Sequence, residues 1–221
     1  MDKELKLDGF STSTSYELFM LGVSLLMYIN LLLLLWLNKG PVYSVVYIID
    51  ILVAGIFFID FLRSFTLAKN KKEYFFKQYG WSDLLSSVPL AIFNIFRVFR
   101  VFRFFRSMRK QGHKKVLRAL LSKIPQAALY GVFFLILIVL EFGSIGVLVA
   151  EKNAIGANIK TASDALWWVY VSITTVGYGD KFPVSNLGRM VGVVTLTVGV
   201  GLFGVVTAYI ANAFLGQKKP E

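Results

Sequence analysis

The run Thr175 to Gly179, with the sequence Thr-Val-Gly-Tyr-Gly, is the segment of this chain best suited to chemistry. Its glycines can adopt backbone angles that are closed to other residues, so an extended strand can turn its carbonyl oxygens inward. Carbonyl oxygens arranged in this way replace the hydration shell of K⁺ in strands with this sequence. The Thr175 hydroxyl can supply a further oxygen ligand. The pattern predicts a K⁺ site made by Thr175, Val176, Gly177, Tyr178 and Gly179.

A second pattern with functional potential is a row of arginines at every third position in an apolar segment. Central arginines are costly in a bilayer, at roughly 2.5 kcal/mol or more each, and therefore mark function. On an α-helix a step of three drifts by about 60°, so the charges form a spiral, whereas a 3₁₀-helix would align them on one face. Either arrangement predicts a voltage-sensing thread. The row is Arg97, Arg100, Arg103, Arg106 and Arg109.

Three other interpretations of this row remain open: a nucleic-acid patch, an amphipathic helix on the membrane surface, and an immobile helix derived from a sensor. The Val and Phe residues that occupy all the other positions between Arg97 and Arg106 disfavour the nucleic-acid patch. Countercharges for a buried row are available in the preceding spans. Asp50 and Asp60 lie ten residues apart, about 15 Å along a helix, and Asp83 follows in the next apolar piece.

The composition shows what must position these residues. The 221 residues are 56% hydrophobic and only 17% charged, which excludes an ordinary soluble domain and a disordered chain. There is no cysteine, so disulfides and thiolate metal sites are excluded, and one histidine cannot form a cluster. A crossing helix needs about 20 apolar residues. We expect six crossings, at 18–37, 42–62, 79–89, 92–109, 127–150 and 187–215, with a short re-entrant helix at 162–172.

The distribution of basic residues predicts how the chain is oriented across the membrane. The chain has 24 Lys and Arg against 13 Asp and Glu. Most of the excess lies in the 69–77 loop, the 109–123 stretch and the C-terminal tail, all on one side of the expected membrane. The positive-inside rule makes that side cytoplasmic. We therefore expect a multi-pass protein of the plasma membrane with both termini in the cytoplasm, and no soluble domain at either end.

Residues 127–215 resemble the pore of a voltage-gated potassium channel. The resemblance runs through Asp164-Ala165-Leu166-Trp167-Trp168, the glycine-rich motif and Phe182-Pro183. It implies that Trp167 pairs with Asp180, that Trp168 packs on Tyr178, and that Glu151 supports the pore helix. Alignment from the motif places Gly199 at a gating hinge, although glycine in a membrane helix can equally serve close packing.

The resemblance extends to the arginine row. In that family a phenylalanine caps a charge-transfer site formed by two acids, which here implies Phe57 as the cap and Asp60 and Asp83 as the acids. Phe58 is the neighbouring candidate for the cap. Asp50 would be the outer countercharge.

The expected fold is therefore an all-α membrane protein with a four-helix voltage-sensor domain followed by a two-helix pore domain. The pore domain contains a re-entrant helix and the selectivity filter, which is the Thr175–Gly179 motif. The expected limits are a cytoplasmic N-terminus at 1–17, the sensor at 18–110, a basic amphipathic linker at 111–123, the pore at 124–215 and a tail at 216–221. Since one chain supplies a quarter of a filter, we expect a homotetramer.

The function expected is passive, voltage-gated and K⁺-selective conduction, with K⁺ as the permeant ion and no organic cofactor. Anionic lipid at the inner face is an expected partner, whereas nucleic acid and a small-molecule substrate are not. No nucleophile–base pair or phosphate loop indicates an enzyme. Two alternatives stay open: a ligand-gated, cyclic-nucleotide-type core with an immobile sensor whose cytosolic domain has been removed, and a membrane scaffold with an inactive pore.

Overall fold

The structure is a computed structural model of the whole chain, and it describes residues 5–7, 10–12, 14–68, 70–77, 80–86 and 125–215. Within these ranges the regular secondary structure is helical apart from one short hairpin, and this confirms the predicted all-α membrane fold. Four of the described helices are long and apolar enough to cross a membrane. The protein is thus a multi-pass membrane protein.

The chain divides into two compact units, one made of residues 1–36 and 47–123, the other of residues 37–46 and 124–221. The first unit contains α1 (Thr14–Trp36) and most of α2 (Pro41–Leu67). Proline suits the first turn of α2 because its missing N–H has no intrahelical partner there. Both helices match predicted crossings, with α2 extending five residues further than expected.

Short elements complete the first unit. Strands β1 (Leu5–Leu7) and β2 (Phe10–Thr12) form an antiparallel hairpin that the sequence did not indicate. Helix α3 (Lys71–Lys77) replaces the predicted polar loop, and α4 (Gly80–Ser86) is the described part of the predicted third crossing. Phe61, Ala68 and Tyr74 form a buried cluster at the end of α2, with Phe65 and Leu84 packed against it. This cluster explains why the polar 71–77 segment folds.

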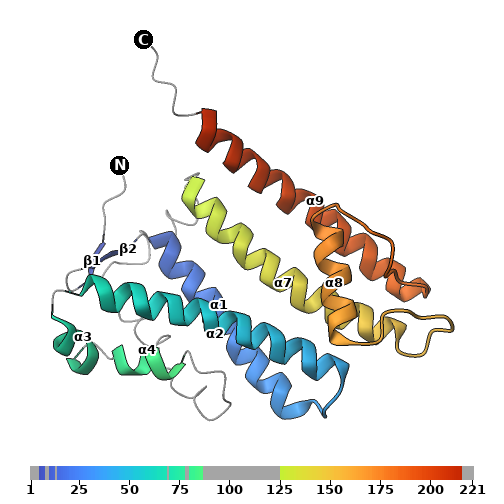
Figure 1. Cartoon of the computed structure of the whole chain (residues 1–221), viewed down its shortest axis with the longest axis horizontal. Helices are drawn as coiled ribbons and strands as arrows, with labels where there is room; N and C mark the ends of the chain where they lie inside the picture. The colour runs from blue at the N-terminus through green and yellow to red at the C-terminus, as the bar shows by residue number, and fades with distance from the viewer. Residues whose placement is uncertain are drawn as a thin grey trace. The chain divides into compact units, whose positions relative to one another are not determined.

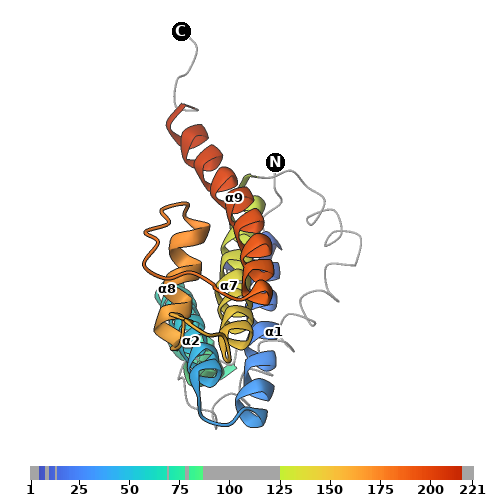
Figure 2. The same cartoon turned by 90° about the vertical axis from the view of Figure 1, so that its right-hand side faces the viewer.

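The second unit contains α7 (Pro125–Glu151), α8 (Ala162–Ile173) and α9 (Asn186–Leu215), which pack on one another. Figure 1 shows α7 and α9 as two long helices with the short α8 against both, and in Figure 2 the segment after α8 doubles back along that helix toward the start of α9. All three helices match the predicted ranges closely.

Small residues allow the helices of the second unit to approach closely. A Cβ atom at Gly143 of α7 would lie 3.3 Å from both Val169 of α8 and Thr195 of α9. One at Gly146 would lie 3.2 Å from Val191. Membrane helices associate through this kind of small-residue packing, because lipid gives no hydrophobic drive between them.

Candidate functional site

Helix α8 begins with a complete N-terminal cap. Thr161 is its N-cap, and the Asp164 backbone N–H donates to Thr161 Oγ1 over 3.1 Å. In return Asp164 Oδ2 accepts the backbone N–H groups of Thr161 and Lys160, at 3.0 and 3.1 Å. This reciprocal pattern is a capping box, which satisfies donors that the first helical turn leaves free. The Thr-x-x-Asp spacing that forms this box is visible in the sequence.

Residues 175–179 have the backbone that the sequence analysis predicted for an ion site. Thr175, Gly177 and Gly179 have φ angles of 60°, 56° and 76°, and Thr175 is the only non-glycine residue with positive φ among those described. An L-residue in this region is strained, and such strain concentrates at functional sites. Positive φ angles at residues 175, 177 and 179 alternate with negative ones at Val176 and Tyr178, so the segment is not an ordinary strand.

Hydrogen bonds fix the direction of the carbonyl groups at the inner end of this segment. The N–H groups of Val176 and Gly177 donate to Val171 O over 3.0 and 3.1 Å, and that of Thr175 donates to Ser172 O over 3.1 Å. In a trans peptide the preceding carbonyl points opposite to the N–H. The carbonyl oxygens of residues 174, 175 and 176 therefore point away from the end of α8, toward one side.

Trp167 holds the outer end of the segment. Its Nε1–H donates to Asp180 Oδ2 over 2.9 Å, as the resemblance implied. The tyrosine contact differs from the expectation, because Tyr178 stacks on Trp167, with 5.6 Å between ring centroids and 5° between planes. Trp168 is instead 5% exposed and lies beside Gly192 of α9. Trp168 thus lies on the face of α8 turned toward α9, and its pairing with Tyr178 stays a prediction.

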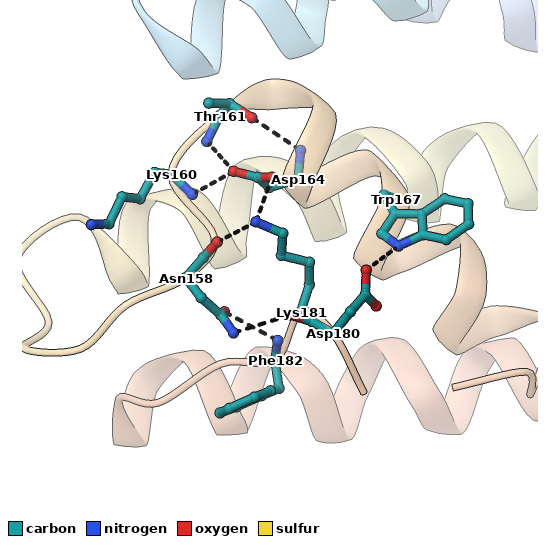
Figure 3. A network of polar contacts seen from close by, with 8 residues as sticks. All are labelled: Asn158, Lys160, Thr161, Asp164, Trp167, Asp180, Lys181 and Phe182. Atoms are coloured by element: carbon teal, nitrogen blue, oxygen red, sulfur yellow. Dashed lines mark hydrogen bonds and ion pairs between the residues drawn. The ribbon is translucent and has the colours of Figure 1, made fainter. Parts of the chain in front are cut away.

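A polar network that the sequence analysis missed lies beside Asp180 (Figure 3). Lys181 Nζ pairs with Asp164 Oδ1 at 2.7 Å and donates to the Asn158 backbone oxygen at 2.9 Å. The Asn158 side chain contacts the backbone on both sides of Lys181. The Lys181 ammonium holds the pKa of the Asp164 carboxyl well below its usual range. Backbone N–H donors at the cap lower this pKa further, and the combined effect of the ammonium and these donors exceeds that of burial, which raises it. A lysine two residues after the Thr175–Gly179 motif was the available signal.

Glu151, at the end of α7, is 1% exposed and holds the start of α9 rather than α8. Its carboxylate accepts the N–H of Val184 at 3.0 Å, the N–H of Ser185 at 2.9 Å and the Ser185 hydroxyl at 2.7 Å. Ser185 in turn caps α9 by accepting the Gly188 N–H at 2.9 Å. The expected support of the pore helix was therefore wrong in its partner, since the acid meets free N–H groups at the next helix start.

Gly199 is a packing point. A Cβ atom there would lie 2.7 Å from the Cα of Ile173, at the end of α8. By contrast, Gly201 and Gly204 on the same helix would meet nothing within 4 Å. Helix α9 continues without a break through Gly199. Of the two interpretations left open by the sequence, close packing is thus observed, and the hinge stays a prediction.

The first unit buries two of the predicted countercharges. Asp50 is 2% exposed and Asp60 is 8% exposed. Phe57 is fully buried one turn before Asp60, whereas Phe58 is 44% exposed, so burial favours Phe57 as the predicted cap. Asp60 Oδ1 accepts the hydroxyl of Tyr16 at 2.5 Å, and the Arg63 guanidinium lies 5.0 Å from the Tyr16 ring centre. Tyr16 was not identified from the sequence.

Other predicted sites lie outside the described residues. These are the arginines Arg97, Arg100, Arg103, Arg106 and Arg109, the side chain of Asp83, the 111–123 linker and the 216–221 tail. Glu141, in contrast, is described and was missed. It is fully buried in the middle of α7, and a single acid inside an apolar run was the signal for it.

Comparisons with known proteins give a consistent result. A model of the ion transport protein family matches residues 13–220. The calcium-gated potassium channel TvoK of Thermoplasma volcanium is 39% identical over 107 residues, which are 48% of this chain and 30% of that protein. A voltage-gated potassium channel of Aeropyrum pernix is 27% identical over 111 residues, which are 48% of this chain and 38% of the relative.

A human relative is similar over a shorter stretch. Potassium voltage-gated channel subfamily KQT member 4 of Homo sapiens is 35% identical over 77 residues, which are 35% of this chain and 11% of that protein. The chain thus spans well under two thirds of each of these relatives.

Proposed function

The chain belongs to the ion transport protein family, and from that premise we propose that it is a voltage-gated channel that conducts K⁺ passively. The observation that carries the proposal is the backbone of residues 175–179. Alternate positive φ angles and carbonyl groups turned away from α8 suit a strand that coordinates a dehydrated ion. Ion channels are not enzymes, and K⁺ is the permeant ion, with no organic cofactor.

The working unit is a homotetramer. One chain supplies only one wall of the site at Thr175, Val176, Gly177, Tyr178 and Gly179. In the single chain this wall is exposed, with Val176 at 54% and Tyr178 at 68%. Helix α9 carries further exposed apolar side chains, including Met190, Val193 and Val194. A tetramer would bring four walls together, and Trp167, Trp168, Asp180 and Glu151 would keep them in place.

Gating belongs to the first unit. We assign the sensor to residues 18–110 and the pore to residues 124–215, joined by the basic 111–123 linker, which lies on anionic lipid at the inner face. The arginines at 97, 100, 103, 106 and 109 carry the charge. Asp50 is the outer countercharge, and Phe57, Asp60 and Asp83 form the charge-transfer site. Both termini are cytoplasmic, the membrane is the plasma membrane, and Gly199 adds a hinge to its packing role.

Two glycine variants test the pore. Gly179 and Gly156 have φ angles of 76° and 79°, and a Cβ atom at either would meet nothing within 4 Å. Gly179→Ala and Gly156→Ala therefore impose similar backbone strain, of about 1–2 kcal/mol. We expect Gly179→Ala to abolish K⁺-selective flux into proteoliposomes and Gly156→Ala to retain it. Equal flux through both variants would contradict the filter assignment.

A second candidate follows from the relative named as calcium-gated. The chain would then be the core of a ligand-gated channel with an immobile arginine row. Stepping the voltage on the full chain separates the two, because the sensor requires a steep response that Arg100→Gln makes shallower. A flat response in the wild type, with selectivity kept, would favour ligand gating.

A further inference from the structure

We propose that Asn158, Asp164 and Lys181 form an outer clamp that positions the extracellular end of the filter and so determines how long it stays conductive when K⁺ is scarce. The inference rests on the proposed K⁺ conduction and adds three positioning residues to it. None of the three coordinates the ion in this account. They act through residues 180–182, which directly follow the filter.

The Asn158 side chain bonds to backbone groups after the filter in the way that the backbone of a neighbouring strand would. Its Nδ2 donates to the Asp180 backbone oxygen over 3.4 Å, and its Oδ1 accepts the Phe182 N–H over 3.2 Å. One amide thus engages the backbone on both sides of Lys181. The contact links the loop before α8 with the chain after the filter, across 22 to 24 residues of sequence.

The Lys181 side chain closes the clamp in the opposite direction. Its ammonium reaches Asp164 Oδ1 at 2.7 Å and the Asn158 backbone oxygen at 2.9 Å (Figure 3). The side chains of Lys181 and Asp164 are only 29% and 20% exposed. A charge-assisted contact of this length, partly shielded from water, is stronger than a pair on an open surface.

The anchor of the clamp is rigid. Asp164 belongs to the first turn of α8, and its other oxygen accepts two backbone N–H groups in the capping box. Moving this carboxylate would therefore unwind the start of the helix. The segment after the filter is held at two places along α8: by Trp167 through Asp180, and by Asp164 through Lys181.

The two ends of the filter differ in what supports them. At the inner end, backbone N–H groups of residues 175–177 donate directly to α8. At the outer end, every one of the contacts described above for residues 180–182 involves a side chain. Carbonyl groups turned toward a common axis repel one another without a cation between them. A bound K⁺ stabilises the conductive arrangement by mass action, and the clamp must do so when K⁺ is low.

The test compares variants of the full chain in planar bilayers while the external K⁺ concentration is varied. Lys181→Met and Asn158→Ala remove the clamp and spare the cap of α8, which an Asp164 variant would break. Lys160→Met is the matched charge control, because Lys160 reaches Asp164 through its backbone N–H and its side chain points away from the cluster (Figure 3). Asn153→Ala is the control for Asn158→Ala, because Asn153 lies in the same loop between α7 and α8 and is exposed.

We expect Lys181→Met and Asn158→Ala to lose current roughly tenfold faster than the wild type at low external K⁺, from the loss of charge-assisted or paired hydrogen bonds. High external K⁺ should restore the wild-type rate, which a general loss of stability would not do. Lys160→Met and Asn153→Ala should behave as the wild type, and Lys181→Arg should rescue most of the effect.

Several results would overturn the clamp. One is equal decay in all variants, and another is faster decay that K⁺ does not correct. Failure of Lys181→Met and Asn158→Ala to form tetramers, with both controls assembled, would assign the network to folding instead. Absence of K⁺ current from the wild type would count against the proposed function, so the two failures are distinct.

Discussion

The two units hold their acidic side chains in different ways. In the pore unit, Glu151 and Asp164 each accept two backbone N–H groups at a helix start. In the other unit, Asp60 accepts the hydroxyl of a tyrosine side chain. A backbone donor cannot leave without moving the chain that leads into the helix, whereas a side-chain donor leaves by changing rotamer. The comparison suggests a pore built to stay fixed and a sensor built to exchange partners.

The largest effect should come from removing the fixed acceptor at Glu151. Glu151→Ala leaves the N–H groups of Val184 and Ser185 without their acceptor, and the Ser185 hydroxyl keeps only the Ala150 oxygen, at a cost of about 3 kcal/mol or more. We expect a large loss of tetramer thermal stability, and an intermediate loss for Glu151→Gln, which keeps one carbonyl oxygen. Lys152→Ala, exposed at the next position, is the control. A Glu151→Ala tetramer as stable as the control would contradict the claim that Glu151 holds the pore unit fixed.

Gly199 tests the same rigidity through packing. Gly199→Ala brings a methyl group against the Ile173 backbone, and we expect a loss of about 2 kcal/mol per chain. Gly201→Ala, two residues later, meets open space and should be tolerated. Thermal unfolding of both tetramers checks this. If Gly199→Ala were as stable as Gly201→Ala and only its gating changed, the hinge would replace packing as the role of Gly199.

Tyr16→Phe sharpens the comparison on the sensor side. The substitution keeps the ring beneath Arg63 and removes the donor to Asp60, worth about 1.5 kcal/mol. With about three charges per sensor, each worth about 2.3 kcal/mol per 100 mV, the midpoint voltage should shift by about 20 mV. The shift should favour sensor states with an arginine at Asp60. Current–voltage curves measure it, and Asp60→Asn should shift the midpoint further. An unchanged midpoint for Tyr16→Phe would argue that this contact is static.

The smallest expected effect is the acid dependence of the pore unit. Because the Asp164 pKa is lowered in the folded protein, its carboxylate stabilises the fold above the ordinary Asp pKa of about 4. That contribution, at most about 1 kcal/mol for a partly exposed pair, is lost as the pH falls below about 4. Tetramer stability should decline more steeply in acid for the wild type than for Lys181→Met. Identical acid profiles would contradict the pairing.

The sequence predicted the long helices well because an apolar run of 20 or more residues has few other solutions in a membrane. It missed α3, whose Tyr74 packs in a buried cluster with Phe61 and Ala68. Among site residues, the bond between Trp167 and Asp180 was predicted by resemblance. The partners of Glu151 and Trp168 were not, because helix packing decides which face each presents. The clamp at Asn158 and Lys181 joins two loops, and loops carry no periodic signal.

The most direct test of the central claim is a recording from the purified full chain in a planar bilayer, with K⁺ on one side, Na⁺ on the other, and stepped voltage. The account predicts a reversal potential near the K⁺ equilibrium value and an open probability that depends steeply on voltage. A reversal potential near zero would contradict the filter, and K⁺ selectivity with a flat voltage response would contradict the sensor.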